Sequence, residues 1–194
     1  TDYELVNRFI DHAVDIGATN WLAVGGDWFN QDFWSQYDYK QPGADVPREL
    51  RASSATMARL LDVFPEVYLT FGNHDTRLHK VLKYAVEFSK TMSWLFSDLP
   101  DDYRKRIKIS NLDHLIIESA QGPYYLAHPA AYNTKPLTTA IDLAAKELKH
   151  VITAHSHHTA IGHDRSGQFV VAEIGGFFAP WKTQYLKRTT KYPK

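Results

Sequence analysis

Short apolar runs alternate along the chain with longer stretches of helical periodicity, and this rhythm restricts the possible folds more than any other feature. Apolar residues recur at three- and four-residue spacing over residues 2–16, which predicts an amphipathic helix. Strand-like runs follow at residues 21–24, 67–71, 115–118, 124–127, 151–154 and 169–172. Further helices are predicted between these runs, at residues 48–64, 78–96 and 136–149. The alternation predicts a layered α/β fold.

The chain is expected to form a single domain spanning residues 1–194. These 194 residues, 44% of them hydrophobic, can enclose one sizeable core. The sequence contains no internal repeat, no low-complexity tract and no linker that would divide it. Residues 28–47 are polar, aromatic and rich in turn-forming residues, and we expect them to form an insertion loop.

Charge and cysteine content restrict the partners and ligands of the protein. Lysine and arginine number 22, as do aspartate and glutamate, so net charge provides no general attraction to nucleic acid or to an anionic membrane. No apolar run approaches the roughly 20 residues of a membrane-spanning helix, so we expect a soluble, cytoplasmic protein without a membrane partner. Cysteine is absent, which leaves imidazole, carboxylate and amide groups as metal ligands.

Potential metal ligands stand at the ends of four predicted strands. Asp27 follows the first of these strands, Asn73 the second and His128 the third. His155 and His157 follow the fourth, and residues two apart in an extended segment face the same way. Because the carboxyl ends of strands in an open α/β sheet meet along one edge, we expect these five side chains to share one site.

The chemistry of this ligand set points to a transition metal. One carboxylate, one amide oxygen and three imidazoles suit Mn²⁺, Fe or Zn²⁺ better than Ca²⁺ or Mg²⁺, which prefer oxygen ligands throughout. Asp27 is the candidate bridge between two ions. Two ions about 3.5–4 Å apart can activate water and stabilise an in-line displacement at phosphorus. The expected cofactor is therefore a pair of divalent ions, with Mn²⁺ as the first choice.

These motifs, taken in order, resemble the calcineurin-like metallophosphoesterase family. The resemblance rests on Gly26-Asp27, Gly72-Asn73-His74-Asp75, His128 and His155-Ser156-His157, and it covers about residues 20–175. It implies a layered β-sandwich flanked by helices. It further implies that Asp27 bridges two metals, that Asn73, His128 and His155 complete one metal site, and that His157 belongs to the other. In this family pattern His74 stabilises the phosphate charge or protonates the leaving oxygen, and Asp75 orients its ring.

The sequence departs from the family pattern at two positions. The family begins with a strand carrying an Asp-x-His pair, whereas this sequence begins at the helix that follows it. We expect that a segment with this pair precedes the sequence in the native protein; the alternative is a weakened first metal site. Ala154 also stands where the family usually has glycine.

The aromatic residues after Asp27 suggest a class of substrate. Trp28, Phe29 and Trp34 lie in the predicted insertion loop, together with Phe33, Tyr37 and Tyr39, and are expected to stack on a nucleobase or another flat group. A small satellite core or an oligomer contact is the alternative. His158 is expected to support the ligands or to face the substrate.

The sequence as a whole predicts a phosphodiesterase that acts on nucleotides or nucleic acid. Two alternatives stay open. One is a phosphomonoesterase, and the other is a non-catalytic binding or scaffold domain with an incomplete metal site.

Overall fold

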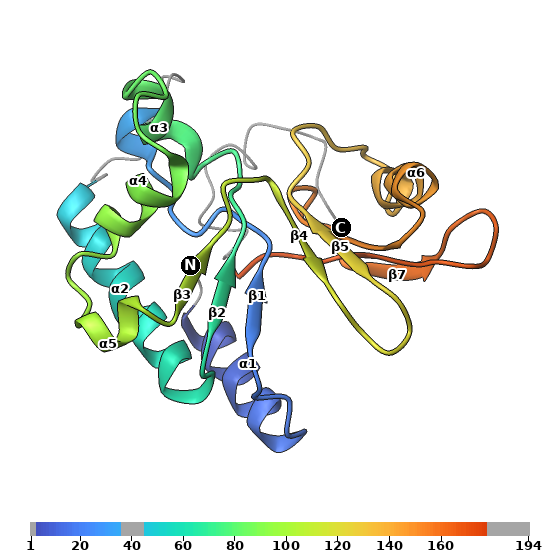
Figure 1. Cartoon of the computed structure of the whole chain (residues 1–194), viewed down its shortest axis with the longest axis horizontal. Coiled ribbons are helices and arrows are strands. Elements are labelled where there is room, and N and C mark those ends of the chain that lie inside the picture. The colour runs from blue at the N-terminus through green and yellow to red at the C-terminus, as the bar shows by residue number, and fades with distance from the viewer. Residues whose placement is uncertain (1–2, 36–44, 178–194) are drawn as a thin grey trace.

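A computed structural model of the chain describes residues 3–35 and 45–177, and its fold is α/β with two sheets (Figure 1). The first sheet has the order β1-β2-β3 and consists of β1 (Leu22–Val24), β2 (Val67–Leu69) and β3 (Ile107–Ile109). The second has the order β4-β5-β6-β8-β7 and consists of β4 (His114–Ile117), β5 (Tyr124–Ala127), β6 (His150–Thr153), β7 (Ala160–His163) and β8 (Val170–Glu173). The α/β class predicted from the sequence is therefore confirmed.

The strands that precede the candidate ligands are parallel to a neighbour in their own sheet. β1 pairs in parallel with β2, and β2 with β3. In the second sheet β5, β6 and β8 are parallel, whereas β4 and β7 run antiparallel at the two edges. The loops that carry Asp27, Asn73, His128 and His155 therefore follow the carboxyl ends of β1, β2, β5 and β6.

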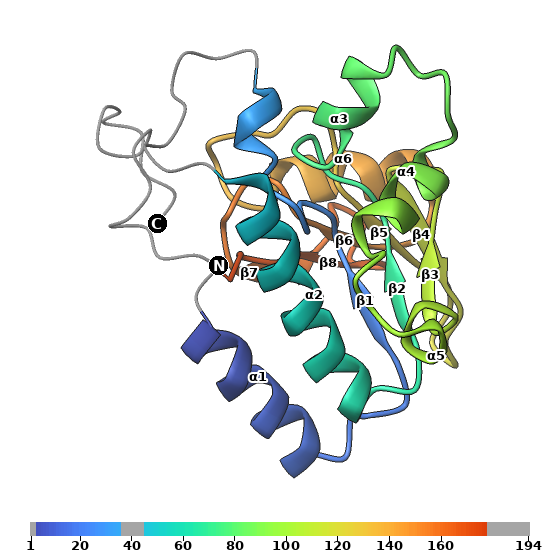
Figure 2. The ribbon, with the colours of Figure 1, turned by 90° about the vertical axis from the view of Figure 1, so that its left-hand side faces the viewer.

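Helices lie on the outer sides of the two sheets. Figure 2 shows α1 (Tyr3–Asp15) and α2 (Val46–Val63) in front of the three-stranded sheet, whereas α6 (Thr138–Glu147) packs against the five-stranded sheet. The apolar residues of α1 recur every three or four positions, so Val6, Ile10 and Ala13 are buried together on one face. At the start of α2 the Asp45 carboxylate accepts the Arg48 N–H and caps the helix.

Two clusters of buried side chains hold these layers together. The larger cluster joins the helices before β3 to the first sheet, and its members include Ile10, Met57, Leu61, Val67, Leu69, Met92 and Phe96. The smaller cluster joins α6 to the second sheet through Ala140, Ala144, Val151 and Val171. The first sheet thus packs against the helices that precede β3, and the second sheet packs against α6.

The structure departs from the predicted elements in several places. The helix predicted at residues 78–96 is two helices, α3 (Thr76–Val81) and α4 (Phe88–Leu95), because Lys83 and Tyr84 adopt left-handed backbone angles between them. The short strands β3 and β7 were not predicted, nor was the 3-10 helix η1 (Asp32–Trp34); α5 (Asp101–Arg104) is a short helix before β3. Of the predicted insertion loop, residues 36–44, including Tyr37 and Tyr39, lie outside the described residues. In the described parts of the chain, no helix has the length and apolar character to cross a membrane.

Candidate metal centre

Four of the five predicted ligands converge beyond the carboxyl ends of the strands. The potential ligand atoms of Asp27, His128 and His155 all lie within 4.8 Å of one another. His128 Nε2 is at the centre of the group, 3.0 Å from His155 Nδ1, 3.2 Å from Asn73 Oδ1 and 3.5 Å from Asp27 Oδ2. His157 is not a member of this close group among the described residues. The four side chains come from both sheets.

The hydrogen-bond geometry of this group is compatible with a bound cation. His128 Nδ1 lies 2.8 Å from the Gly25 carbonyl oxygen, which can only accept, so in the neutral tautomer the proton is on Nδ1. His128 Nε2 then has a lone pair directed at the carboxylate oxygen of Asp27, the amide oxygen of Asn73 and a nitrogen of His155. Burial, together with the nearby His128, lowers the pKa of His155 to about 4, so this ring is neutral near pH 7. Lone pairs that converge in this way are satisfied by a divalent metal ion, and the mixed nitrogen and oxygen set suits Mn²⁺, Fe or Zn²⁺.

The ligands are held in backbone conformations that most residues avoid. Asp27, His155 and His157 have φ angles of 54°, 76° and 60°, in the left-handed region. Each such conformation costs a non-glycine residue about 1–2 kcal/mol, and strain of this kind concentrates at functional sites. Three of the eight non-glycine residues with positive φ in the described structure are therefore predicted ligands.

Two glycines allow the loops after β1 and β2 to approach each other. A Cβ on Gly72 would lie 2.1 Å from Asp27 Oδ1 and 2.5 Å from Asp27 N. A Cβ on Gly26, whose φ is +86°, would lie 2.6 Å from Gly72 N and 2.8 Å from His128 Nδ1. Only glycine fits at these positions without a shift of the ligands, which gives a physical reason for the Gly-Asp and Gly-Asn pairs.

The Asp75 side chain binds backbone groups of the two loops that follow β1 and β2. Its buried carboxylate accepts backbone N–H groups from Phe29 at 2.8 Å, Gly72 at 3.0 Å and Trp28 at 3.3 Å. Asp75 thereby ties together the two loops that carry Asp27 and Asn73. Burial, followed by the nearby Asp27 carboxylate, raises the pKa of Asp75 to about 7.

The residue that contacts the His74 ring is Asn30, which the sequence reasoning missed. His74 Nδ1 lies 2.8 Å from Asn30 Oδ1, and the His74 backbone N–H donates to Asp27 Oδ1 at 2.9 Å. Burial lowers the pKa of His74, while the Asp27 carboxylate opposes this shift. The available signal was the position of Asn30, a polar residue three places after Asp27 in the same loop.

Hydrogen bonds and an ion pair connect the first part of the predicted insertion loop to the segment after β2. The Gln31 side chain donates to the Asp75 carbonyl oxygen at 3.1 Å and accepts the Leu78 N–H at 2.8 Å. Arg77 forms an ion pair with Asp32 at 2.8 Å, and both side chains are largely shielded from solvent. Residues 28–34 are therefore part of the scaffold of the site.

Of the predicted aromatic contacts to substrate, Phe29 belongs to the core. It is 1% exposed and its ring centre lies 5.1 Å from that of Phe96, so no face is available for stacking. Trp28 packs against the same core and has an indole N–H without a hydrogen-bond partner in the described structure. Trp34 is half-buried in η1, beside the exposed ring of Phe33.

Tyr132, which the sequence reasoning overlooked, is an exposed aromatic residue beside the candidate ligand His155. Its ring meets that of His155 edge to face at 5.1 Å and is 55% exposed. It lines an open cavity of about 350 Å³, together with Asn133, Thr139 and Lys146. No strand or motif precedes Tyr132 directly, so the sequence carried little signal for its position.

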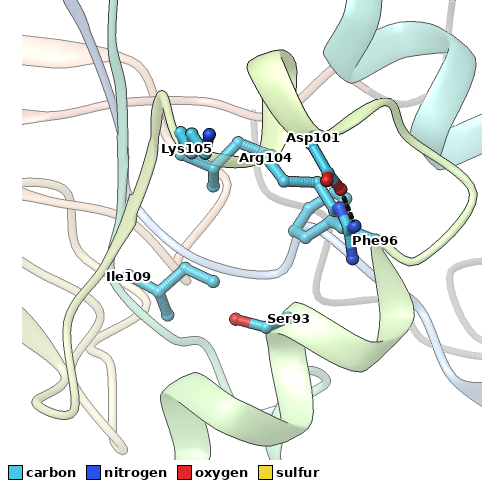
Figure 3. A pocket seen from close by; sticks show the side chains of 7 residues that line it. Ser93, Phe96, Asp101, Arg104, Lys105 and Ile109 are labelled. Carbon is cyan, nitrogen blue, oxygen red and sulfur yellow. Dashed lines mark hydrogen bonds and ion pairs between the residues drawn. The ribbon is translucent and has the colours of Figure 1, made fainter.

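Another cavity lies apart from these residues. Figure 3 shows this space of about 380 Å³ between α4, α5 and β3, lined by Ser93, Phe96, Lys105 and Ile109 and by the ion-paired Asp101 and Arg104. None of the candidate ligands lines it.

The sequence matches none of the protein-family models and none of the curated proteins with which it was compared.

Proposed function

We propose that this chain is a metal-dependent phosphoester hydrolase with a layered sandwich fold of the metallophosphoesterase kind, acting on phosphodiester bonds of nucleotides or nucleic acid. The main support is the convergence of Asp27, Asn73, His128 and His155, whose lone pairs face one another at the ends of four strands. These are the residues to which the family resemblance gives metal-binding roles.

The four converging residues would hold one divalent ion, and His157 with Asp27 would contribute to a second. Bound ions would supply an activated water nucleophile and positive charge opposite the phosphate oxygens. The protein supplies the scaffold: Asp27 keeps one oxygen on the His74 N–H and the other near His128. Gly26 and Gly72 permit this close arrangement.

His74 is the candidate general acid. Its Nδ1 is engaged by Asn30, so Nε2 is the ring nitrogen left to contact substrate. Burial lowers the pKa of the ring and thereby favours its neutral form. A phosphate anion next to the ring raises that pKa, so the charged ring can then donate a proton to the leaving oxygen.

A non-catalytic binding domain is the second candidate, and one observation favours it. The described residues assemble one close group of ligands, and His157 stands outside it. This candidate predicts at most one bound ion per chain and no turnover of any phosphoester in excess Mn²⁺.

Metal content and hydrolysis, measured on the same samples, test the proposal. We expect close to two metals per chain by elemental analysis and Mn²⁺-dependent hydrolysis of bis-p-nitrophenyl phosphate. Asp27→Ala should lose both metal and turnover, whereas His74→Ala should keep metal and lose rate. His163→Ala, on the exposed end of β7, is the control and should change neither.

Three outcomes would contradict parts of the proposal. Absence of both metal and activity in the chain, and in a version extended by any native segment that precedes it, would reject the hydrolase. Much faster hydrolysis of p-nitrophenyl phosphate would favour the phosphomonoesterase. Normal turnover by His74→Ala would remove the role given to that residue.

A further inference from the structure

Glu173, at the end of β8, is a buried carboxylate that the proposed reaction does not use. The residue is 2% exposed, and its Oε1 atom has no hydrogen-bond partner in the described structure. Its Oε2 atom accepts the Ser156 hydroxyl at 3.2 Å and lies 3.0 Å from His158 Nδ1. Because a carboxylate is costly to remove from water, its burial next to the metal-ligand loop requires an explanation.

The contacts of Glu173 form a closed network with the loop that carries His155 and His157. Ser156 Oγ donates to Glu173 and also accepts the His158 backbone N–H at 3.2 Å. His158 Nδ1 completes the network by donating to the same carboxylate oxygen. The segment after β8 lies beside this loop, since a Cβ on Gly175 would lie 2.6 Å from Thr159 Oγ1 and 3.9 Å from the His157 carbonyl oxygen.

Alternate residues of this loop differ in burial and in backbone conformation. Ser156 and His158 are buried beside Glu173, whereas His155 and His157 are only partly buried and adopt left-handed φ angles of 76° and 60°. Left-handed angles are unfavourable for histidine, so contacts elsewhere must hold them. The Glu173 network fixes the residue between the two histidines and the residue after them.

We propose that Glu173, acting through Ser156 and His158, is a positioning residue that holds His155 and His157 in their strained, ligand-ready conformations. This inference rests on the metal site proposed above. The structural relation is that of an outer carboxylate that orients metal-binding histidines, but here it acts through the backbone of the loop. His158 accordingly supports the ligands and does not face the substrate.

Metal affinity of variants of the chain tests this role. We expect Glu173→Ala to weaken Mn²⁺ binding about 10–100-fold, the usual effect of losing an outer-sphere partner, as measured by competition with a chelating dye. Glu173→Gln keeps the size and one acceptor oxygen, so it should recover part of the affinity. Ser156→Ala should show a smaller loss. Thr153→Val, which changes a buried polar residue paired with Glu173 across the sheet, is the matched control and should bind Mn²⁺ normally.

Two further measurements separate positioning from general stability. The absorption spectrum of bound Co²⁺ reports ligand geometry and should change in the Glu173 variants but not in Thr153→Val. Amide hydrogen exchange at residues 155–158, measured without metal, should become at least about tenfold faster in Glu173→Gln, because the loop then opens more readily.

The outcomes distinguish failure of this inference from failure of the proposed function. Unchanged Mn²⁺ affinity, Co²⁺ spectrum and loop exchange in folded Glu173→Gln would overturn the positioning role. If neither the chain nor a version extended by any native segment that precedes it binds metal, the proposed hydrolase fails, and loop exchange in the metal-free chain alone decides the role of Glu173.

Discussion

Replacement of Asp75 by alanine should destabilise the chain, because three backbone N–H groups lose their acceptor. The donors belong to Trp28, Phe29 and Gly72, and the carboxylate that receives them is buried. An unsatisfied buried donor costs about 1–3 kcal/mol, so three of them, one with a long contact, amount to about 3–6 kcal/mol. Removing the carboxylate also relieves its own burial, which raises its pKa to about 7. The expected net loss of unfolding free energy is about 2–4 kcal/mol.

Urea unfolding followed by tryptophan fluorescence measures this loss directly. Asp75→Asn keeps one acceptor oxygen and should lose about half as much. Asp62→Ala removes an exposed carboxylate that accepts the Tyr103 hydroxyl, and should cost less than about 1 kcal/mol. A loss below about 1 kcal/mol in Asp75→Ala would refute the view that this carboxylate ties the two ligand loops together.

Three further predictions follow from the geometry of the site. Gly72→Ala should abolish tight Mn²⁺ binding and cost about 1–3 kcal/mol by displacing Asp27, whereas Gly162→Ala, which meets only a flexible leucine end, should leave Mn²⁺ titrations unchanged. The pKa of His155 falls from 6.5 to about 4 on folding, so the urea midpoint of the metal-free chain should decrease as the pH drops through this interval. His155→Gln should show a smaller decrease, and an equal pH dependence of the two proteins would contradict the shift. Tyr132→Ala should raise KM several-fold for a dinucleotide but little for dimethyl phosphate, and equal effects on both would exclude stacking by this ring.

The sequence predicted the strands that precede the candidate ligands better than it predicted the residues that contact those ligands. Asp27, Asn73, His128 and His155 each follow an apolar strand, but these strands belong to two sheets, and the rule for one open sheet gave no signal for the way the two sheets bring the residues together. The supporting contacts obey no comparable rule. Asn30 reaches His74 across 44 residues of sequence, which no local periodicity indicates.

Burial of aromatic residues was also beyond the reach of local pattern. Phe29 lies two residues after the candidate ligand Asp27, in a polar segment that predicted an exposed loop. In the structure the Asp75 carboxylate accepts its backbone N–H, and its ring packs in the core. Tyr132 is the converse case, because its ring is exposed beside His155 although no local pattern predicted this position. In both, the side chain is placed by long-range contacts, and these override local composition.

The two buried carboxylates divide the support of the site between the sheets. Asp75 holds the loops after β1 and β2, which provide Asp27 and Asn73, while Glu173 holds the loop after β6, which provides His155. The two halves meet at His128, whose Nδ1 donates to Gly25 and whose Nε2 faces ligands from both sheets. Each carboxylate thus orders the candidate-ligand loops of one sheet, and His128 lies between these two sets of loops. Loss of either carboxylate should therefore weaken metal binding without removing a ligand, because an ion needs both halves at their correct separation.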